Sequence, residues 1–241
     1  MQIINVYDSD TETAATKLKN ALAEYGSGYF DSYDTDFTDE NGWKIVNCYI
    51  GNDVVVKFKQ KTNNKFSIDI GNITIDAASS SVNYHITRVY VCNKGIVFFS
   101  HNGDNAEFDK PIMMCKTEHG DIAFVNFTGN INARSQYSPR IIDYGQSYTS
   151  YLSTVCLNKI TKTAHSKTTS VAPVDSSSSS GANDPTSVQG YQLFDPIDGA
   201  MLDGVYFIQY CGIRDLPPGY FVVNGETYTG FGKYTLALKG R

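Results

Sequence analysis

Charged residues are scarce in this sequence of 241 residues, and basic ones especially so. Charged side chains make up 19% of the chain and aromatic ones 13%, with a single tryptophan. A chain this rich in aromatic residues and poor in charge folds around a core, which argues against a disordered protein. Lys and Arg number 20 against 25 Asp and Glu, so the net charge is −5. General binders of nucleic acids or anionic membranes cluster basic residues, so we expect neither nucleic acid nor a membrane as a partner.

Long apolar runs are also missing. The longest, such as residues 96–99, are a handful of residues, far short of the roughly 20 that a membrane-spanning helix needs. The first residues of the chain show neither the basic stretch nor the apolar segment of a secretory signal. We therefore expect a protein made in the cytoplasm.

Cysteine is used sparingly and in an odd number. The five cysteines are far apart, and each lies in or beside an apolar segment: Cys48, Cys92, Cys115, Cys156 and Cys211. A disulfide framework uses cysteines densely and in pairs, whereas isolated cysteines in apolar surroundings are typical of buried free thiols. The pattern predicts free thiols in a reducing compartment.

One helix is predicted, over residues 9–26. Ser9 and Glu12 have the spacing of a capping box, in which two side chains bond to N–H groups of the first turn. Alanine, leucine and tyrosine residues then recur at steps of three and four along one face. Gly26 is expected to end the helix in a left-handed conformation.

From residue 43 the period of the pattern changes to two, which indicates strands. Segments 43–50 and 53–59 flank Gly51, segments 84–92 and 96–100 flank Gly95, and segments 112–117 and 121–127 flank Gly120. A further pair, 65–70 and 72–76, surrounds Gly71. Glycine at each separator permits the positive φ of a tight turn. We predict a mostly β fold, an antiparallel sandwich or open barrel with one N-terminal helix and a C-terminal β-hairpin element.

The composition changes again at residue 161. Residues 161–190 contain 13 serines and threonines and no aromatic residue, too little apolar surface to offset the entropy of ordering. We expect three parts: a helix and β domain at 1–160, a linker or arm at 161–190, and a small β element at 191–241. In the last part, Asn224-Gly225 between alternating apolar residues is a strong hairpin signal. The sequence leaves open whether this element returns to the preceding sheet or packs as a separate unit. With about 50 residues it has only a marginal core of its own, so we favour dependence on a partner's surface.

A catalytic or metal site is not evident in the sequence. The densest acidic cluster fails the EF-hand pattern, because Asp39 and Ile45 stand where glycine and glutamate are required when Asp34 is taken as the first position. Cys115 and His119 lack a second pair of zinc ligands. Neither His-Glu-x-x-His nor Gly-x-Ser-x-Gly occurs, and Gly230–Lys233 does not form a phosphate loop. We expect no enzyme activity, no cofactor and no metal.

Aromatic and basic residues gather in one irregular stretch, a mixture that suits an interface or stacking against sugar rings. The same mixture occurs in a half-buried β edge. The candidate interface or ligand surface consists of Tyr137, Arg140, Tyr144, Tyr148 and Tyr151.

The segment 219–239, together with the hairpin around residues 114–117 and 124–126, resembles small virion proteins of tailed bacteriophages or prophages. The resemblance implies a structural component of a phage particle, made in the cytoplasm of a bacterial host, without a cofactor. It places the protein in a tail, baseplate or neck assembly, with capsid decoration next, and its partners would be other virion proteins and copies of itself. The candidate assembly tail consists of Tyr220, Val222, Tyr228 and Phe231. The alternative function is a carbohydrate-binding or host-receptor-binding module that recognises a host surface glycan.

Overall fold

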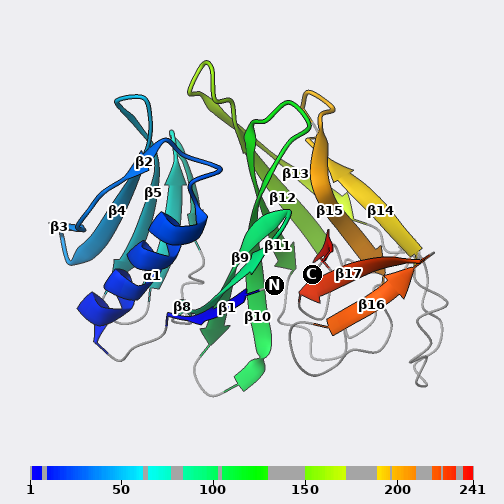
Figure 1. Cartoon of the computed structure of the whole chain (residues 1–241), viewed down its shortest axis with the longest axis horizontal. Coiled ribbons are helices and arrows are strands. Elements are labelled where there is room, and N and C mark those ends of the chain that lie inside the picture. The colour runs from blue at the N-terminus through cyan, green and yellow to red at the C-terminus, as the bar shows by residue number, and fades with distance from the viewer. Residues whose placement is uncertain are drawn as a thin grey trace, which may run out of the picture.

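The structure is a computed structural model that describes residues 2–6, 10–61, 65–76, 84–102, 105–129, 150–171, 189–195, 197–209, 219–223, 225–231 and 236–240. Within them the fold is mostly β, with three antiparallel sheets and one helix. The sheets stand beside one another, with a seven-stranded sheet in the middle (Figure 1). The predicted fold class, mostly β with antiparallel sheets and one N-terminal helix, is confirmed, and of the two predicted arrangements, sandwich or open barrel, the sheets are consistent with a sandwich.

The first sheet is built from the hairpins predicted between residues 43 and 76. Its strands run in the order β2-β4-β5-β6-β7, and β3 also pairs with β4. Gly51 and Gly71 have φ values of 60° and 57°, as the predicted turns require. The strands are β2 (Ser32–Tyr33), β3 (Thr38–Glu40), β4 (Trp43–Ile50), β5 (Asp53–Lys61), β6 (Lys65–Ile70) and β7 (Ile73–Asp76).

The central sheet has the order β1-β8-β9-β10-β11-β12-β13. Its strands are β1 (Gln2–Asn5), β8 (Tyr84–Cys92), β9 (Gly95–Asn102), β10 (Asn105–Lys116), β11 (Ile122–Gly129), β12 (Ser150–Leu157) and β13 (Ala164–Val171). The prediction of a linker starting at residue 161 is wrong for β13, which pairs with β12 along its whole length. Backbone hydrogen bonds to a neighbouring strand order this serine- and threonine-rich segment without a large apolar face of its own. Residues 172–188 of the predicted arm lie outside the described residues.

The third sheet contains the C-terminal strands in the order β14-β15-β18-β17-β16. They are β14 (Gln189–Phe194), β15 (Met201–Gln209), β16 (Gly219–Val223), β17 (Glu226–Phe231) and β18 (Leu236–Lys239). Strands β16 and β17 pair as predicted, and Gly225 between them has a φ of 81°. The C-terminal hairpin is therefore confirmed.

Both faces of the central sheet are buried at its middle strands. On one face, Ile96 and Phe98 of β9 point into a first core shared with the first sheet and the helix. On the other face, Val97 of β9 and Met113 of β10 belong to a second core shared with the third sheet. Burial on both faces explains the short apolar runs in the middle strands, such as residues 96–99 of β9, since neither face needs polar residues there.

The helix, α1 (Thr11–Tyr25), packs its alanines and leucines into the first core. Its N-cap is Asp10 and not the predicted Ser9, because the Asp10 carboxylate accepts the Thr13 N–H at 2.9 Å. Gly26 ends the helix as predicted, but with a φ of −86° and not in the left-handed region. Glycine is required there for space, because a Cβ would lie 1.8 Å from the Tyr33 hydroxyl oxygen.

The third sheet covers the chain's own central sheet. Leu202, Val205 and Leu238 are completely buried in the second core. Where the central and third sheets meet, the Glu118 N–H donates to the Met201 carbonyl at 2.8 Å. The expectation that residues 191–241 need an outside surface to cover their core is therefore corrected, since that surface is the central sheet.

Within the described part of the chain, no helix has the length and apolar character needed to cross a membrane.

Candidate functional site

The predicted tyrosine and arginine surface falls almost entirely outside the described residues. This applies to Tyr137, Arg140, Tyr144 and Tyr148. Tyr151 belongs to β12, where its backbone lies opposite Ser170 of β13. The candidate ligand surface therefore stays a prediction.

The four residues of the predicted assembly tail lie on two neighbouring strands, Tyr220 and Val222 on β16 and Tyr228 and Phe231 on β17. The Val222 side chain is 59% exposed, whereas Tyr228 is buried. The Tyr228 ring meets the Tyr206 ring edge to face at 5.2 Å, and its hydroxyl donates to Glu226 at 3.1 Å. Of Val222 and Tyr228, Val222 is therefore the residue whose side chain a partner could contact.

The acidic cluster at residues 31–40 forms hydrogen bonds and ion pairs within the first sheet and its loops. Asp34 accepts hydrogen bonds from the Asn47 N–H at 3.0 Å and the Tyr49 hydroxyl at 2.7 Å. Asp31 accepts the Gly51 N–H at 2.7 Å, and Asp39 pairs with Lys44 at 2.5 Å. These carboxylates face separate partners, which is typical of a charged surface loop and not of a calcium site.

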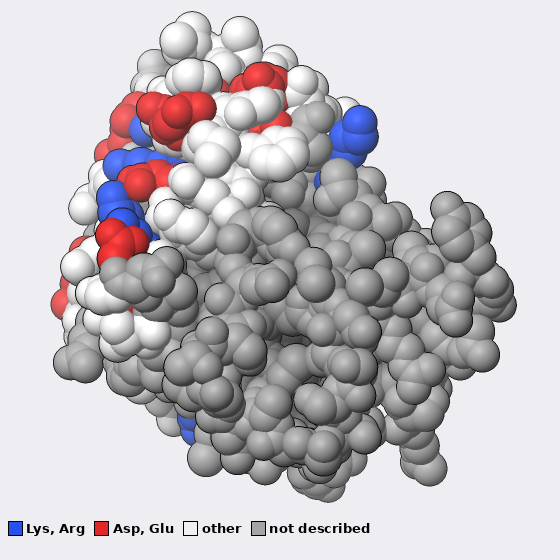
Figure 2. Space-filling model, turned by 90° about the vertical axis from the view of Figure 1, so that its right-hand side faces the viewer, with Lys and Arg blue, Asp and Glu red and all other residues white. Residues whose placement is uncertain are grey.

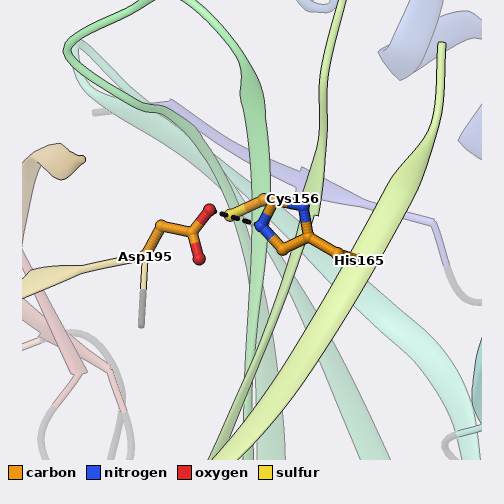
Figure 3. A group of neighbouring side chains, drawn as sticks. All are labelled: Cys156, His165 and Asp195. Carbon is orange, nitrogen blue, oxygen red and sulfur yellow. Dashed lines mark hydrogen bonds and ion pairs between the residues drawn. The ribbon is translucent and has the colours of Figure 1, made fainter. Parts of the chain in front are cut away.

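One group of potential metal ligands occurs among the described residues, and sequence reasoning missed it. Cys156, His165 and Asp195 each direct one donor atom toward the others, and these atoms lie within 4.8 Å of one another (Figure 3). Cys115 is buried in the second core outside this group, and His119 is exposed in the turn after β10.

Two of the three residues are a cross-strand pair. Cys156 on β12 lies directly opposite His165 on β13, so their side chains share one face of the central sheet. The turn between the strands is ordered by Asn158, whose side-chain oxygen accepts the N–H groups of Ile160 and Thr161 at 3.0 and 2.8 Å. Lys162 takes the left-handed conformation, with a φ of 59°.

The third residue, Asp195, comes from the loop that follows β14 in the third sheet. One carboxylate oxygen accepts the Ile197 N–H at 3.0 Å, which holds the side chain in place. The other lies 2.5 Å from Nε2 of His165. The side chain of Asp195 is 1% exposed and that of His165 is 33% exposed, so the cluster reaches from the interior toward the surface.

Burial and hydrogen bonding set the charges of the cluster. Burial raises the pKa of the Cys156 thiol, and its hydrogen bond to Asp195 raises it further. Burial also acts to raise the pKa of Asp195, but hydrogen bonds from Ile197, His165 and Cys156 outweigh it and leave that pKa below its usual value. At neutral pH without a metal, the carboxylate is ionised and the thiol is protonated.

These protonation states disfavour a cysteine nucleophile. A catalytic thiol needs a lowered pKa, usually from an adjacent histidine or a helix N-terminus. Here the thiol donates to a buried carboxylate, which strengthens its hold on the proton. The geometry, with three donor atoms directed toward one another, suits the binding of a ligand.

Sequence reasoning missed the cluster for two reasons. His165 fell in the segment interpreted as a linker, because the turn at residues 158–163 has no glycine to mark a hairpin. Asp195 is on a different sheet, so only the packing of the sheets places it beside the other two. Asparagine at the start of that turn was the one local signal available.

Comparison of the chain with protein-family models, with curated proteins and with solved structures gives no match. The resemblance to phage virion proteins therefore remains a prediction from the sequence.

Proposed function

We propose that this protein is a structural component of a phage particle that acts through protein–protein interfaces, in a tail, baseplate or neck assembly. The observation that carries the proposal is the edge strand β16. It pairs with β17 on one side and has no second partner strand among the described residues. Its sequence, Gly-Tyr-Phe-Val-Val, contains no charged residue.

An uncharged edge strand is unusual in a protein that stays alone. Its free N–H and C=O groups can pair with a strand of another chain, so proteins that avoid association place lysine, proline or a bulge there. Val222 at this edge exposes 59% of its side chain. Strand β16 thus has the properties of a surface that another chain covers.

The position of the resembling segment and the state of the cysteines also support this proposal. The segment that resembles virion proteins, residues 219–239, contains β16, β17 and β18, so the resemblance includes this edge strand. Figure 2 shows the molecule from the side of the third sheet, where the described surface carries both charged and uncharged side chains. Cys48, Cys115 and Cys156 are buried free thiols. Free thiols suit a structural protein that is made in a reducing compartment.

The proposal is tested with Val222→Lys in the full chain. Because this side chain is exposed, the substitution leaves the fold intact while it adds a charge to the edge. We expect the wild-type protein to form oligomers in light scattering and the variant to need at least about tenfold higher concentration to do so. Val54→Lys is the matched control, because Val54 is 42% exposed but lies on β5, an interior strand of the first sheet.

A second measurement addresses the particle. Quantitative mass spectrometry of particles purified from the producing bacterial culture should find the wild-type and Val54→Lys proteins and much less of Val222→Lys. A wild-type protein that stays monomeric and is absent from particles would contradict the proposal. Specific binding on a glycan array by that monomer would favour the receptor-binding alternative.

A further inference from the structure

The Cys156, His165 and Asp195 cluster has the donor set of a zinc site. It combines one sulfur, one imidazole nitrogen and one carboxylate oxygen, the three ligand types that Zn²⁺ uses in proteins. Calcium and magnesium prefer sites made only of oxygen atoms, so a thiolate and an imidazole disfavour both. We propose that these three residues bind one zinc ion, which joins the central sheet to the third sheet.

The distances are compatible with such an ion after a small adjustment. Tetrahedral coordination places neighbouring ligand atoms about 3.3–3.6 Å apart. Without an ion, Nε2 of His165 and Oδ2 of Asp195 are 2.5 Å apart, and all three donor atoms lie within 4.8 Å of one another. The two side chains need to separate by about 1 Å to admit the ion.

The backbone holds the ligands where the ion would need them. Cys156 and His165 are register partners on paired strands, so their separation is set by the sheet. The second oxygen of Asp195 is occupied by the Ile197 N–H, which leaves Oδ2 directed at the cluster (Figure 3). Hydrogen bonds of this kind orient metal ligands in known sites.

The charge of the cluster also favours a divalent cation. On binding zinc, the Cys156 thiol releases its proton to solvent, and Nε2 of His165 gives up the hydrogen that it donates to Asp195, so that the neutral ring carries its hydrogen on Nδ1. The thiolate and the Asp195 carboxylate then balance the two positive charges. Burying a neutral site costs much less free energy than burying an unpaired charge, and the side chain of Asp195 is only 1% exposed. The three protein ligands leave one tetrahedral position, which a water molecule can fill on the side of the partly exposed His165.

The competing explanation is a His–Asp pair with a thiol beside it and no metal. A measurement of metal binding distinguishes the two explanations. The full-length protein is treated with a chelator, dialysed and titrated with Zn²⁺ and with Co²⁺. We expect one ion per chain, and thiolate-to-cobalt charge-transfer absorption in the near ultraviolet. Cys156→Ala should abolish that absorption, and His165→Gln should weaken zinc binding by at least about 100-fold.

Two controls guard against general effects of the substitutions. Cys48→Ala removes a buried thiol from the first core, and His119→Gln removes an exposed histidine, and both should bind zinc like the wild type. Circular dichroism checks that His165→Gln is folded, which its 33% exposed side chain favours. A folded wild-type protein without cobalt–thiolate absorption, or a Cys156→Ala variant that binds zinc equally, would overturn the proposal.

The role in joining the sheets has its own readout. Zinc should raise the Tm of the wild-type protein, because an ion that binds only the folded state stabilises it by mass action. The same zinc concentration should leave the Tm of His165→Gln unchanged. Stoichiometric zinc binding without a rise in Tm would refute the joining role.

Discussion

At the scale of single residues, burial controls the chemistry of the cysteines. The structure describes four of the five, and all four are free thiols, as predicted. Burial is the largest cause that raises the pKa of each of them. Cys211 lies outside the described residues. The apolar neighbours that are visible in the sequence were sufficient to predict this behaviour, because burial follows from them.

Cys92 offers the clearest test, because it is only partly buried. Burial raises its pKa to about 11, so about one thiol in a thousand is ionised at pH 8. Since the thiolate is the form that reacts, iodoacetamide should label Cys92 slowly at pH 8 and about tenfold faster for each pH unit up to pH 10. Mass spectrometry of the labelled peptide measures this, with protein in urea as the control. Equal rates in the folded and unfolded protein would show that burial does not protect this thiol.

At the scale of elements, the central sheet depends on close contact between strands. Gly95 at the start of β9 pairs with Cys115 of β10 and is buried. A Cβ at this position would lie 2.8 Å from the Met114 carbonyl oxygen and 3.2 Å from a methyl group of Leu238. The sequence marked Gly95 as a turn residue, but the structure shows that it also makes room for the third sheet.

Gly95→Ala should therefore destabilise the protein. Either the strands or Leu238 of the third sheet must move to admit the added methyl group, which costs about 1–3 kcal/mol. Urea unfolding measures the change in the free energy of unfolding. Gly28→Ala is the matched control: the nearest atom is 3.5 Å away at the end of the Lys116 side chain, so we expect less than about 0.5 kcal/mol. Similar losses for the two variants would contradict this account.

At the scale of the whole molecule, the third sheet is part of the same folded body as the central sheet. The second core contains large side chains from both, including Tyr90 and Met113 from the central sheet and Leu202 from the third. The ion pair between Lys94 and Asp203, at 2.9 Å, crosses the same border. The sequence predicted a domain at residues 1–160, yet within the described part of the chain the C-terminal strands cover one face of its sheet.

A chain that ends at Val171 should therefore expose an apolar face. Val97, Met113 and Val125 are completely buried in the full chain, and removal of the third sheet would open them to solvent. We expect the shortened protein to bind a hydrophobic dye and to aggregate through this face. In the full chain the third sheet covers the face, so we expect neither effect from it. Fluorescence and light scattering measure both. A monomeric fragment without dye binding would show that the third sheet is dispensable for this core.

Elements with local signals could be predicted from the sequence alone. The helix and the hairpins at Gly51, Gly71 and Asn224-Gly225 follow from periodicity and turn residues within a few positions, and all of them form. The strand β13 was missed, because it is ordered by hydrogen bonds to β12 and not by its own apolar pattern. The packing of the C-terminal strands on the central sheet, which brings Asp195 to Cys156 and His165, became visible in the three-dimensional fold. Contacts between sheets depend on surfaces that the whole chain builds, and no local pattern in the sequence records them.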